Sequence, residues 1–230
     1  MFSQKRELLI TILFNRKTAL VWDFSKIDKI KSEVASDQEI CTIEYKIWQA
    51  SDFPISRALN IIVIKILKKR LRAELLKYCY KLYQNLWFLI NKKEKNKYCI
   101  VNAVININNV TIQDTNISSN IEKFAEEFAE IVIALLIDFF SNYNQIDLAL
   151  KSRNLTAFIT PLDLLRITRL SQKTTNSIVQ FVQVITHILK DLLDKCISFV
   201  DNIDVKSSKT NYNNKKAILD IRLFVLNYIQ

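Results

Sequence analysis

Apolar runs that end at polar turns recur along the 230-residue chain and predict a fold of mixed helices and strands. Residues 131–138 are an apolar run that ends in an aspartate, and residues 196–200 are a second run that meets Asp201 and Asn202. Asp and Asn both tolerate positive φ, so this pair suits a two-residue hairpin turn. The second run is therefore expected to fold back at this pair and to continue as a strand over 203–205.

Apolar positions three and four residues apart predict helices elsewhere in the chain, and short apolar runs predict further strands. The clearest helix covers 175–193, because its apolar positions form one stripe of the kind that packs into a core. The other expected helices cover 60–76, 119–128 and 214–228. The other expected strands cover 87–90, 98–101, 155–160 and 164–170. The apolar run over 8–14 is expected to be a buried helix or strand, since a membrane span needs about 20 residues.

The two runs that end in aspartate suggest a metal site. A single aspartate at a strand end is usually a turn residue and nothing more. Two strands that deliver Asp138 and Asp201 to one sheet edge would, however, meet the needs of two-metal phosphoryl chemistry, in which the cations lie about 3.5–4 Å apart.

The residues around both carboxylates also match a known pattern. Ile137-Asp138 with Ser141-Asn-Tyr143-Asn-Gln145 is similar to LDL-x-SGY-x-Q, and Phe199-Val-Asp-Asn202 is similar to the [YF]-x-D-D hairpin, of reverse transcriptases from gypsy-type LTR retrotransposons. Three further segments resemble other motifs of that family, in the family's order: 86–93 (PWFxVKKK), 108–112 (NKVTI) and 170–177 (LPQGATNS). Five ordered motifs over roughly residues 55–230 make the resemblance specific.

The resemblance implies an α+β fold of the right-hand polymerase type, with fingers, a palm, and an antiparallel palm sheet backed by helices. Residues 1–50 carry no motif and are expected to be a linker-like segment, whereas 51–230 would be the fingers and palm. No thumb or RNase H motif follows the catalytic hairpin. The implied activity is RNA-directed DNA synthesis, with an RNA or DNA template-primer and deoxynucleoside triphosphates as partners.

The resemblance also assigns roles to individual residues. Asp138 and Asp201 would bind two Mg²⁺ ions, the main-chain carbonyl of Phe139 would add a ligand, and Asn202 stands at the second aspartate of the hairpin. Magnesium bound there would activate the primer hydroxyl and neutralise charge on the triphosphate.

Four more positions would contact the incoming nucleotide or its template partner. Lys92 or Lys93 would supply a point charge for the phosphates. Tyr143 would stack under the sugar and exclude a 2′-hydroxyl, and Gln172 would touch the template-side nucleotide. Cys99 occupies the position at which the family carries an arginine that forks onto a phosphate.

Three departures from the family's motifs predict that this copy is inactive. Asn202 brings an amide without charge to the metal site, Cys99 cannot make the forked phosphate contact, and Lys173 is bulky where the motif has glycine. Each lesion affects a different part of the machinery: metal binding, phosphate binding and template fit.

The composition favours a mutationally decayed element. The chain contains no glycine, although average usage of about 7% predicts roughly 16 in a chain of this length. Asn142, Lys173 and Asp163 stand where the motifs carry glycine, and transition mutations account for these changes and for Asn202 and Cys99. Restoring glycine at 142 and 173 is expected to raise the melting temperature wherever positive φ is required.

The net charge of +10 allows a second interpretation, a non-catalytic basic domain that binds nucleic acid. The basic positions of the 60–76 helix would then line a nucleic-acid groove, although a solvated face is the simpler explanation. A third idea, that this helix lies on a membrane surface, is the weakest of the three.

Neither the cysteines nor the histidine of the sequence predicts a metal site or a catalytic site. The four cysteines have no C-x-x-C spacing, so neither a zinc site nor a disulfide framework is predicted. Reduced thiols are typical of an intracellular protein, whether cytoplasmic or nuclear. His187, the only histidine, lacks a familiar catalytic partner and is expected to be structural or exposed.

Overall fold

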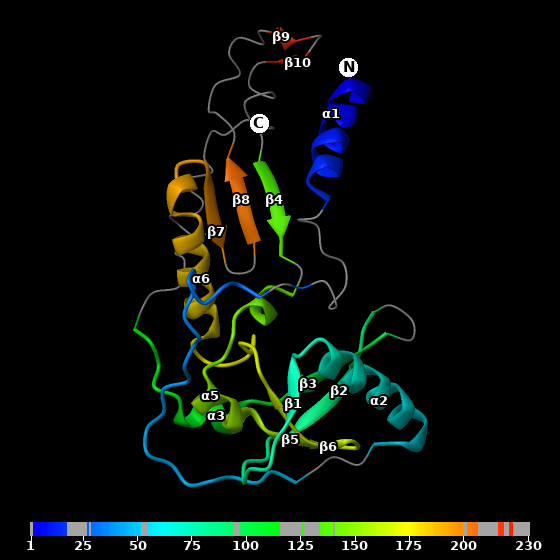
Figure 1. Cartoon of the computed structure of the whole chain (residues 1–230), viewed down its shortest axis with the longest axis vertical. Coiled ribbons are helices and arrows are strands. Elements are labelled where there is room, and N and C mark those ends of the chain that lie inside the picture. The colour runs from blue at the N-terminus through cyan, green and yellow to red at the C-terminus, as the bar shows by residue number, and fades with distance from the viewer. Residues whose placement is uncertain are drawn as a thin grey trace. The chain divides into compact units, whose positions relative to one another are not determined.

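The computed structural model describes residues 2–17, 27, 29–51, 55–93, 97–115, 126, 134–139, 141–199, 202–206, 216–218 and 221–222 (Figure 1). The chain divides into two compact units. Unit 1 comprises residues 1–22, 117–140 and 182–230, and unit 2 comprises residues 23–116 and 141–181.

Unit 2 is built from two small antiparallel sheets and short helices. One sheet has the strand order β1–β6–β5, and the other pairs β2 with β3. Its elements are α2 (Arg57–Arg72), β1 (Leu76–Tyr78), β2 (Trp87–Asn91), β3 (Tyr98–Asn102), α3 (Ile105–Val110), η3 (Asn142–Gln145), α5 (Leu150–Arg153), η4 (Asn154–Thr156), β5 (Phe158–Thr160) and β6 (Asp163–Ile167). The strands predicted at 87–90 and 98–101, and the hairpin predicted within 155–170, are therefore confirmed.

Helix α2 closes the main core of unit 2. Its residues Val63 and Leu67 are fully buried and pack with side chains from both sheets. Trp87 and Phe158 meet there with ring centroids 6.4 Å apart, and the Trp87 Nε1–H donates to the carbonyl of Ile159. Burial of these large apolar side chains is the dominant source of stability in the unit.

A second cluster joins the described residues of the 29–51 segment to the rest of unit 2. Ile40 is buried with Ile107 and Leu148, and Trp48 packs at the edge of the cluster. The Trp48 Nε1–H donates to Asn85 Oδ1, whose fully buried amide in turn donates to two backbone carbonyls. Isolated bridges at Gln38, Thr42 and Gln49 extend these contacts along the segment.

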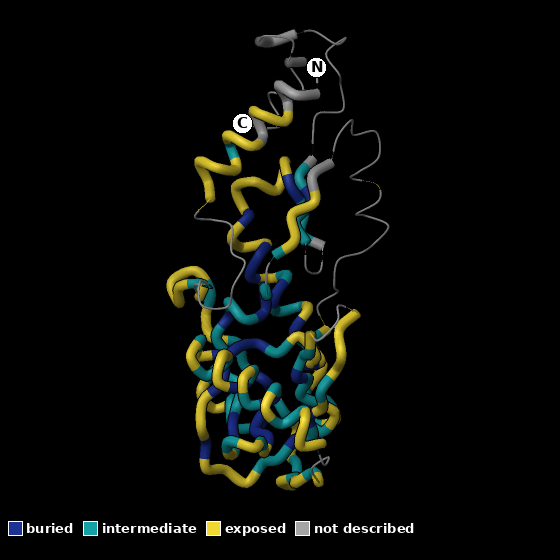
Figure 2. Tube along the Cα trace, turned by 90° about the vertical axis from the view of Figure 1, so that its right-hand side faces the viewer, coloured by how far each residue is buried: buried dark blue, intermediate teal, exposed yellow. Residues whose placement is uncertain are grey.

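Unit 1 contains a three-stranded antiparallel sheet of order β4–β8–β7. Its elements are α1 (Phe2–Asn15), β4 (Ala134–Asp138), η5 (Lys190–Leu192), β7 (Cys196–Phe199), β8 (Asn202–Lys206), β9 (Lys216–Ile218) and β10 (Ile221–Arg222), and α6 (Ser177–Ile188) runs from unit 2 into unit 1. Helix α1 confirms a helix over the first apolar run. The expectation that this run is buried is wrong at Ile10, Leu13 and Phe14, which are exposed. Figure 2 colours the exposed positions of the described chain yellow.

Helix α6 confirms the clearest helical prediction in its centre. Phe181, Ile185 and Leu189 of the predicted stripe are buried, whereas Ile188 is 42% exposed.

No helix among the described residues has both the length and the apolar character that a membrane crossing requires.

The predicted C-terminal helix is wrong in the part that the structure describes. Residues 216–218 and 221–222 form strands β9 and β10, which pair antiparallel with Ile218 opposite Ile221. The β-branched residues at these positions favour paired strands over a helix. The helix predicted at 119–128 lies outside the described residues, apart from Glu126.

Helix α2 ends four residues before its predicted limit because the chain makes a Schellman turn. The Leu75 N–H donates to the carbonyl of Arg70, and the Glu74 N–H donates to the carbonyl of Leu71. This turn requires a left-handed residue just past the helix, and Glu74 has φ 55° there. A non-glycine residue is strained in this conformation, so a glycine-free chain carries a cost at this position.

The backbone strain expected at positions 142 and 173 is not found there, and positive φ occurs at other positions. Among the described residues, positive φ occurs at Glu74 and Ser141 (both 55°) and at Asp163 (156°). Of the three positions at which the family's motifs carry glycine, only 163 has positive φ. Asn142 already belongs to the 3-10 turn that follows Ser141, and Lys173 lies in a turn closed by a hydrogen bond from Thr174 N–H to the Ser171 carbonyl. Neither Asn142 nor Lys173 has positive φ, so glycine would bring no conformational advantage at these positions.

We therefore expect Glu74→Gly to raise the free energy of unfolding by about 1 kcal/mol, because glycine adopts positive φ without a steric penalty. Urea unfolding of the full chain measures this change. Asn142→Gly is the matched control: it is expected to give no gain, since the residue has negative φ and its Oδ1 accepts a hydrogen bond from Tyr143 N–H. Equal stabilisation by both substitutions would contradict the assignment of strain to Glu74.

Candidate active site and nucleotide cleft

One sheet edge in unit 1 carries the described part of the predicted metal site. Strand β4 ends at Asp138 and pairs with β8 so that Asp138 lies opposite Asn202. Directly opposed Cα atoms in an antiparallel pair are about 4.5–5.5 Å apart. The Asp138 side chain is exposed, so its carboxylate is available to a ligand. The apolar run that precedes it forms the strand, which explains why the carboxylate comes to lie at the strand's end.

The hairpin that faces Asp138 differs by one residue from its prediction. Asn202 pairs with Phe199 and is the first residue of β8, so it belongs to the strand and not to the turn. Two residues, 200 and 201, connect β7 to β8. Asp201 lies outside the described residues, and the distance between the two predicted metal ligands remains a prediction.

The donor set at this edge is made of oxygen atoms. Asp138 offers a carboxylate, Asn202 an amide opposite it, and half-buried Phe139 a main-chain carbonyl. Oxygen ligands suit magnesium, which is bound through one or two carboxylates with water and phosphate completing its shell. Among the described residues, no group of three or more His, Cys, Asp or Glu side chains gathers in a way that could hold a metal.

A cleft of about 210 Å³ in unit 2 brings together three of the residues predicted to contact the nucleotide. Cys99, Tyr143 and Gln172 all line it, as does Lys173. Lys92 and Lys93 are exposed and do not line the cleft; the backbone of Lys92 closes the β2–β3 connection by donating to the Lys97 carbonyl.

Local structure positions each of these side chains. The turn of η3 buries Tyr143, whose ring lies 4.9 Å from that of Phe181. Cys99 is half-buried on β3, and Gln172 is exposed in the turn that precedes α6. The floor of the cleft is apolar and includes Ile100 and Phe158 from the main core.

Arg70 is a cleft residue that the sequence did not distinguish. Its guanidinium reaches in from α2, with Nη2 3.9 Å from Cys99 Sγ, and burial lowers the pKa of Arg70. In the sequence it follows Lys68 and Lys69, and nothing in that basic run separates an inward-facing cation from an exposed one. Only the docking of α2 on β3 identifies it.

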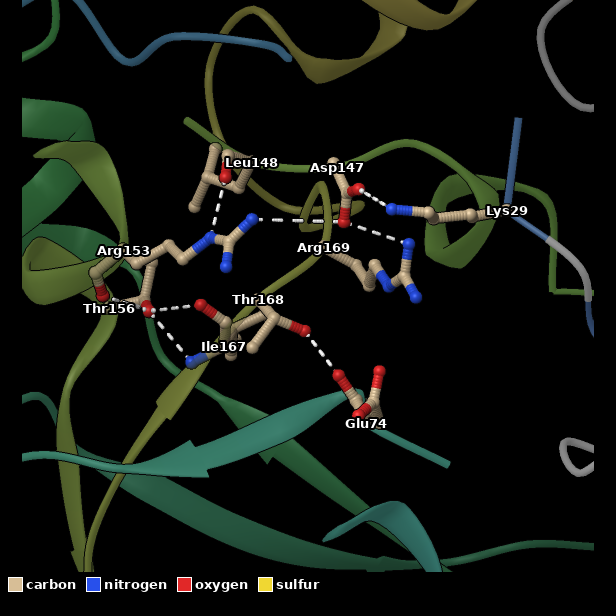
Figure 3. A network of polar contacts seen from close by, with 9 residues as sticks. All are labelled: Lys29, Glu74, Asp147, Leu148, Arg153, Thr156, Ile167, Thr168 and Arg169. Carbon is tan, nitrogen blue, oxygen red and sulfur yellow. Dashed lines mark hydrogen bonds and ion pairs between the residues drawn. The ribbon is translucent and has the colours of Figure 1, made fainter. Parts of the chain in front are cut away.

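A charged network lies beside this region of unit 2 (Figure 3). The Asp147 carboxylate accepts a hydrogen bond from Arg169 Nη1 at 2.8 Å and forms ion pairs with Lys29 Nζ at 3.2 Å and Arg153 Nη2 at 3.8 Å. Arg153 also donates through Nε to the Leu148 carbonyl. The network joins the segment after η3 to the end of β6.

A second, wider hollow of about 1040 Å³ runs along α2 and is strongly basic. We call it the basic groove. Six of its lining residues are cationic and one is acidic: Lys29, Lys65, Lys68, Lys69, Arg72 and Arg169, with Glu74. The exposed side chain of Ile61 adds an apolar patch to its wall.

Comparison with solved structures defines the class of fold. The chain superposes on the protease-reverse transcriptase of prototype foamy virus with a TM-score of 0.71 and 18% identity over 88% of its length. A foamy viral protease-reverse transcriptase in complex with double-stranded DNA gives 0.76 and 15% identity over 92%. A third, in complex with an RNA/DNA hybrid, gives 0.72 and 15% over 92%.

These comparisons show that the chain has a reverse-transcriptase-like fold of mixed helices and antiparallel sheets. The chain spans 27%, 36% and 28% of those three structures respectively. No family model matches the sequence, and no curated protein matches it.

Near the sheet edge, Asp204 is buried in the central strand β8, opposite Leu136 and Ile197. Burial raises the pKa of this carboxyl above its ordinary value. The folded chain therefore binds this proton more tightly than the unfolded chain does. The contribution of Asp204 to stability is most favourable below the unfolded pKa of about 3.9, and it is lost as the pH rises through the raised folded value.

We expect Asp204→Asn to raise the melting temperature at pH 7 and to lose this advantage as the pH falls towards about 4. Thermal unfolding at a series of pH values measures the difference. Asp194→Asn replaces an exposed carboxylate of unit 1 and is expected to change little at any of these pH values. A pH-independent gain in Asp204→Asn would argue against the burial of a charged carboxylate as the cause.

Proposed function

We propose that the chain is the fingers and palm of an RNA-directed DNA polymerase of the gypsy-type LTR retrotransposon class, in a copy whose catalytic site is degenerate. The observation that carries the proposal is the register of the β4–β8–β7 sheet, which sets Asp138 opposite Asn202 beside the β7–β8 connection. Two further observations support the proposal. The chain has a reverse-transcriptase-like fold, and its sequence motifs occur in the order of the reverse transcriptase family.

In this proposal the sheet edge binds magnesium and the cleft binds the nucleotide. Asp138 and Asp201 would hold the metal with the carbonyl of Phe139, and the metal would supply charge neutralisation and an activated primer hydroxyl. Tyr143 would orient the sugar, and Gln172 would contact the template-side nucleotide. Lys92 and Lys93 would add positive charge at the tip that joins β2 to β3.

The loss of activity follows from charge and shape. Asn202 offers a neutral oxygen where a second carboxylate would balance the cations, and magnesium binds such an oxygen more weakly. Lys173 adds a cation to the lining of the cleft, where the family's motif has glycine. Residues of a catalytic site act as a unit, so one lesion can remove most of the activity.

We expect no magnesium-dependent primer extension by the unmodified chain on an RNA template, and none after Asn202→Asp alone, because Lys173 still lines the cleft and the residues of a catalytic site act as a unit. Combining Asn202→Asp, Cys99→Arg and Lys173→Gly with a thumb grafted from a working relative is expected to restore incorporation. A gel assay with labelled primer measures it.

In the restored protein, Asp138→Ala is expected to abolish synthesis and Asp194→Ala, which removes an exposed carboxylate of the same unit, is expected to leave it intact. Synthesis by the unmodified chain would overturn the claim of inactivity. A restored protein indifferent to Asp138→Ala would overturn the proposed metal site.

A second candidate function is non-catalytic binding of nucleic acid, which the basic groove favours. Lys65, Lys68 and Arg72 project from one helix into a hollow with a single acidic residue in its lining. Such a surface attracts a phosphate backbone, and each neutralised phosphate releases counterions. This function needs neither Asp138 nor Asp201.

We expect the full chain to bind a single-stranded oligonucleotide with a strong dependence on salt. The double substitution Lys65→Gln with Lys68→Gln is expected to reduce the slope of log affinity against log salt by roughly 1.4, since each lost phosphate contact removes about 0.7. Fluorescence anisotropy measures the slope. The control pair, Lys77→Gln with Lys81→Gln, removes the same charge from exposed positions of unit 2 outside the groove, and an equal reduction there would rule out the groove as the binding surface.

A further inference from the structure

The cleft contains a guanidinium that the motifs of the reverse transcriptase family do not explain. Arg70 belongs to α2, three residues before the turn at Ala73, and its side chain is half-buried against β3. Its Nη2 lies 3.9 Å from Cys99 Sγ, so the guanidinium occupies the space next to the position where the family's motif carries arginine. An arginine stays charged under all ordinary conditions, even where burial opposes the charge.

This cation has no acidic counterpart in the cleft. Among the described residues, no carboxylate lies within ion-pair distance of Arg70, and no Asp or Glu lines the cleft. Lys173 contributes a second positive charge to the lining. A guanidinium partly withdrawn from water is costly unless an anion or hydrogen-bond acceptors accompany it, and a thiol is a weak acceptor. The charge balance of the cleft therefore favours an anionic ligand.

The size and polarity of the cleft narrow the class of anion. Its volume of about 210 Å³ is below the ~300–1,000 Å³ of sites that enclose drug-sized ligands, so it can enclose the phosphate groups of a nucleotide but not the whole molecule. The buried Oδ1 of Asn102 has no hydrogen-bond partner among the described residues, so the cleft also offers an acceptor to a ligand hydroxyl. The planar guanidinium can bind two phosphate oxygens at once.

We propose that Arg70 is the phosphate-binding residue of the cleft and supplies, from helix α2, the guanidinium that the family's motif carries at position 99. The small side chain of Cys99 leaves space in the cleft for the Arg70 guanidinium. That the phosphate belongs to a deoxynucleoside triphosphate rests on the proposed function, whereas the binding of polyphosphate by Arg70 does not.

Calorimetric titration of the full chain with inorganic tripolyphosphate, without magnesium or primer, tests the site directly, and a parallel titration with dATP tests the source of the phosphate. We expect Arg70→Met, which keeps an apolar stem, to weaken tripolyphosphate binding about 10- to 100-fold. Arg70→Lys keeps the charge but loses the paired N–H donors of the guanidinium. Its affinity for tripolyphosphate is expected to lie between those of the unmodified chain and Arg70→Met. Arg57→Met removes the same charge from an exposed position of the same helix, outside both the cleft and the basic groove, and is expected to change affinity less than about threefold.

The most specific test moves the guanidinium from position 70 to position 99. Arg70→Met combined with Cys99→Arg is expected to recover most of the binding, because the guanidinium then enters the same cleft from β3. Circular dichroism and the melting temperature of each variant establish that it is folded. Equal losses in Arg70→Met and Arg57→Met, or no tripolyphosphate binding by the unmodified chain, would overturn the proposal. Binding of tripolyphosphate but not dATP would uphold the role of Arg70 and count against the proposed polymerase ancestry of the cleft.

The cysteines provide a measurement that needs no substitution. Cys99 is half-buried beside Arg70, whereas Cys41 is exposed elsewhere in unit 2. We expect tripolyphosphate to slow the alkylation of Cys99 by iodoacetamide at least about fivefold at saturation and to leave Cys41 unchanged, as peptide mass spectrometry would show. Equal rates at Cys99 with and without tripolyphosphate would overturn the proposal.

Discussion

The Asp147 carboxylate holds three segments of unit 2 together, because it pairs with three cations that come from different elements. Lys29 comes from the N-terminal segment, Arg153 from the end of α5, and Arg169 from just beyond β6. Asp147, Arg153 and Arg169 have side chains only 11–18% exposed, so the pairing operates where water screens it weakly. Each guanidinium would lack its counter-charge without this carboxylate. The segment after Tyr143 would also lose one of its links to the residues beyond β6, where the Leu148 N–H donates to the Thr168 carbonyl.

The cleft differs from this network in its charge balance, because no Asp or Glu of the described residues lines it. Arg70 reaches the cleft through the packing of α2 on the β2–β3 hairpin, and the Schellman turn at Glu74 ends that helix where β1 must begin. The strained backbone at Glu74 is thus a consequence of a glycine-free sequence that keeps the turn geometry. The Glu74 carbonyl also accepts a hydrogen bond from Thr168 Oγ1, which holds the turn against the strand that leads to Arg169.

The residues at the sheet edge and those in the cleft suit different ligands, a divalent metal and an anion respectively, and the anion is the better supported of the two. At the edge, an exposed Asp138 faces a neutral Asn202, a poorer setting for divalent metal than two opposed carboxylates. In the cleft, Arg70 and Lys173 supply positive charge. Anion binding therefore suits the residues of this chain better than divalent-metal binding does, because it needs a cation and a shaped surface and not a matched pair of carboxylates.

The sequence alone determined the strands that end at Asp138 and Phe199, the β2–β3 pair, the centre of α6 and the reverse-transcriptase-like fold, because apolar periodicity and motif order are local properties of the chain. It also grouped Cys99, Tyr143 and Gln172 as parts of one site, through their order among the motifs. Tertiary structure alone decided the end of α2, the location of backbone strain at Glu74 and Ser141, the β9–β10 pair, and the entry of Arg70 into the cleft. These depend on which face of an element is covered and on hydrogen bonds between segments far apart in the chain, and neither is encoded in the spacing of residues along a single basic helix.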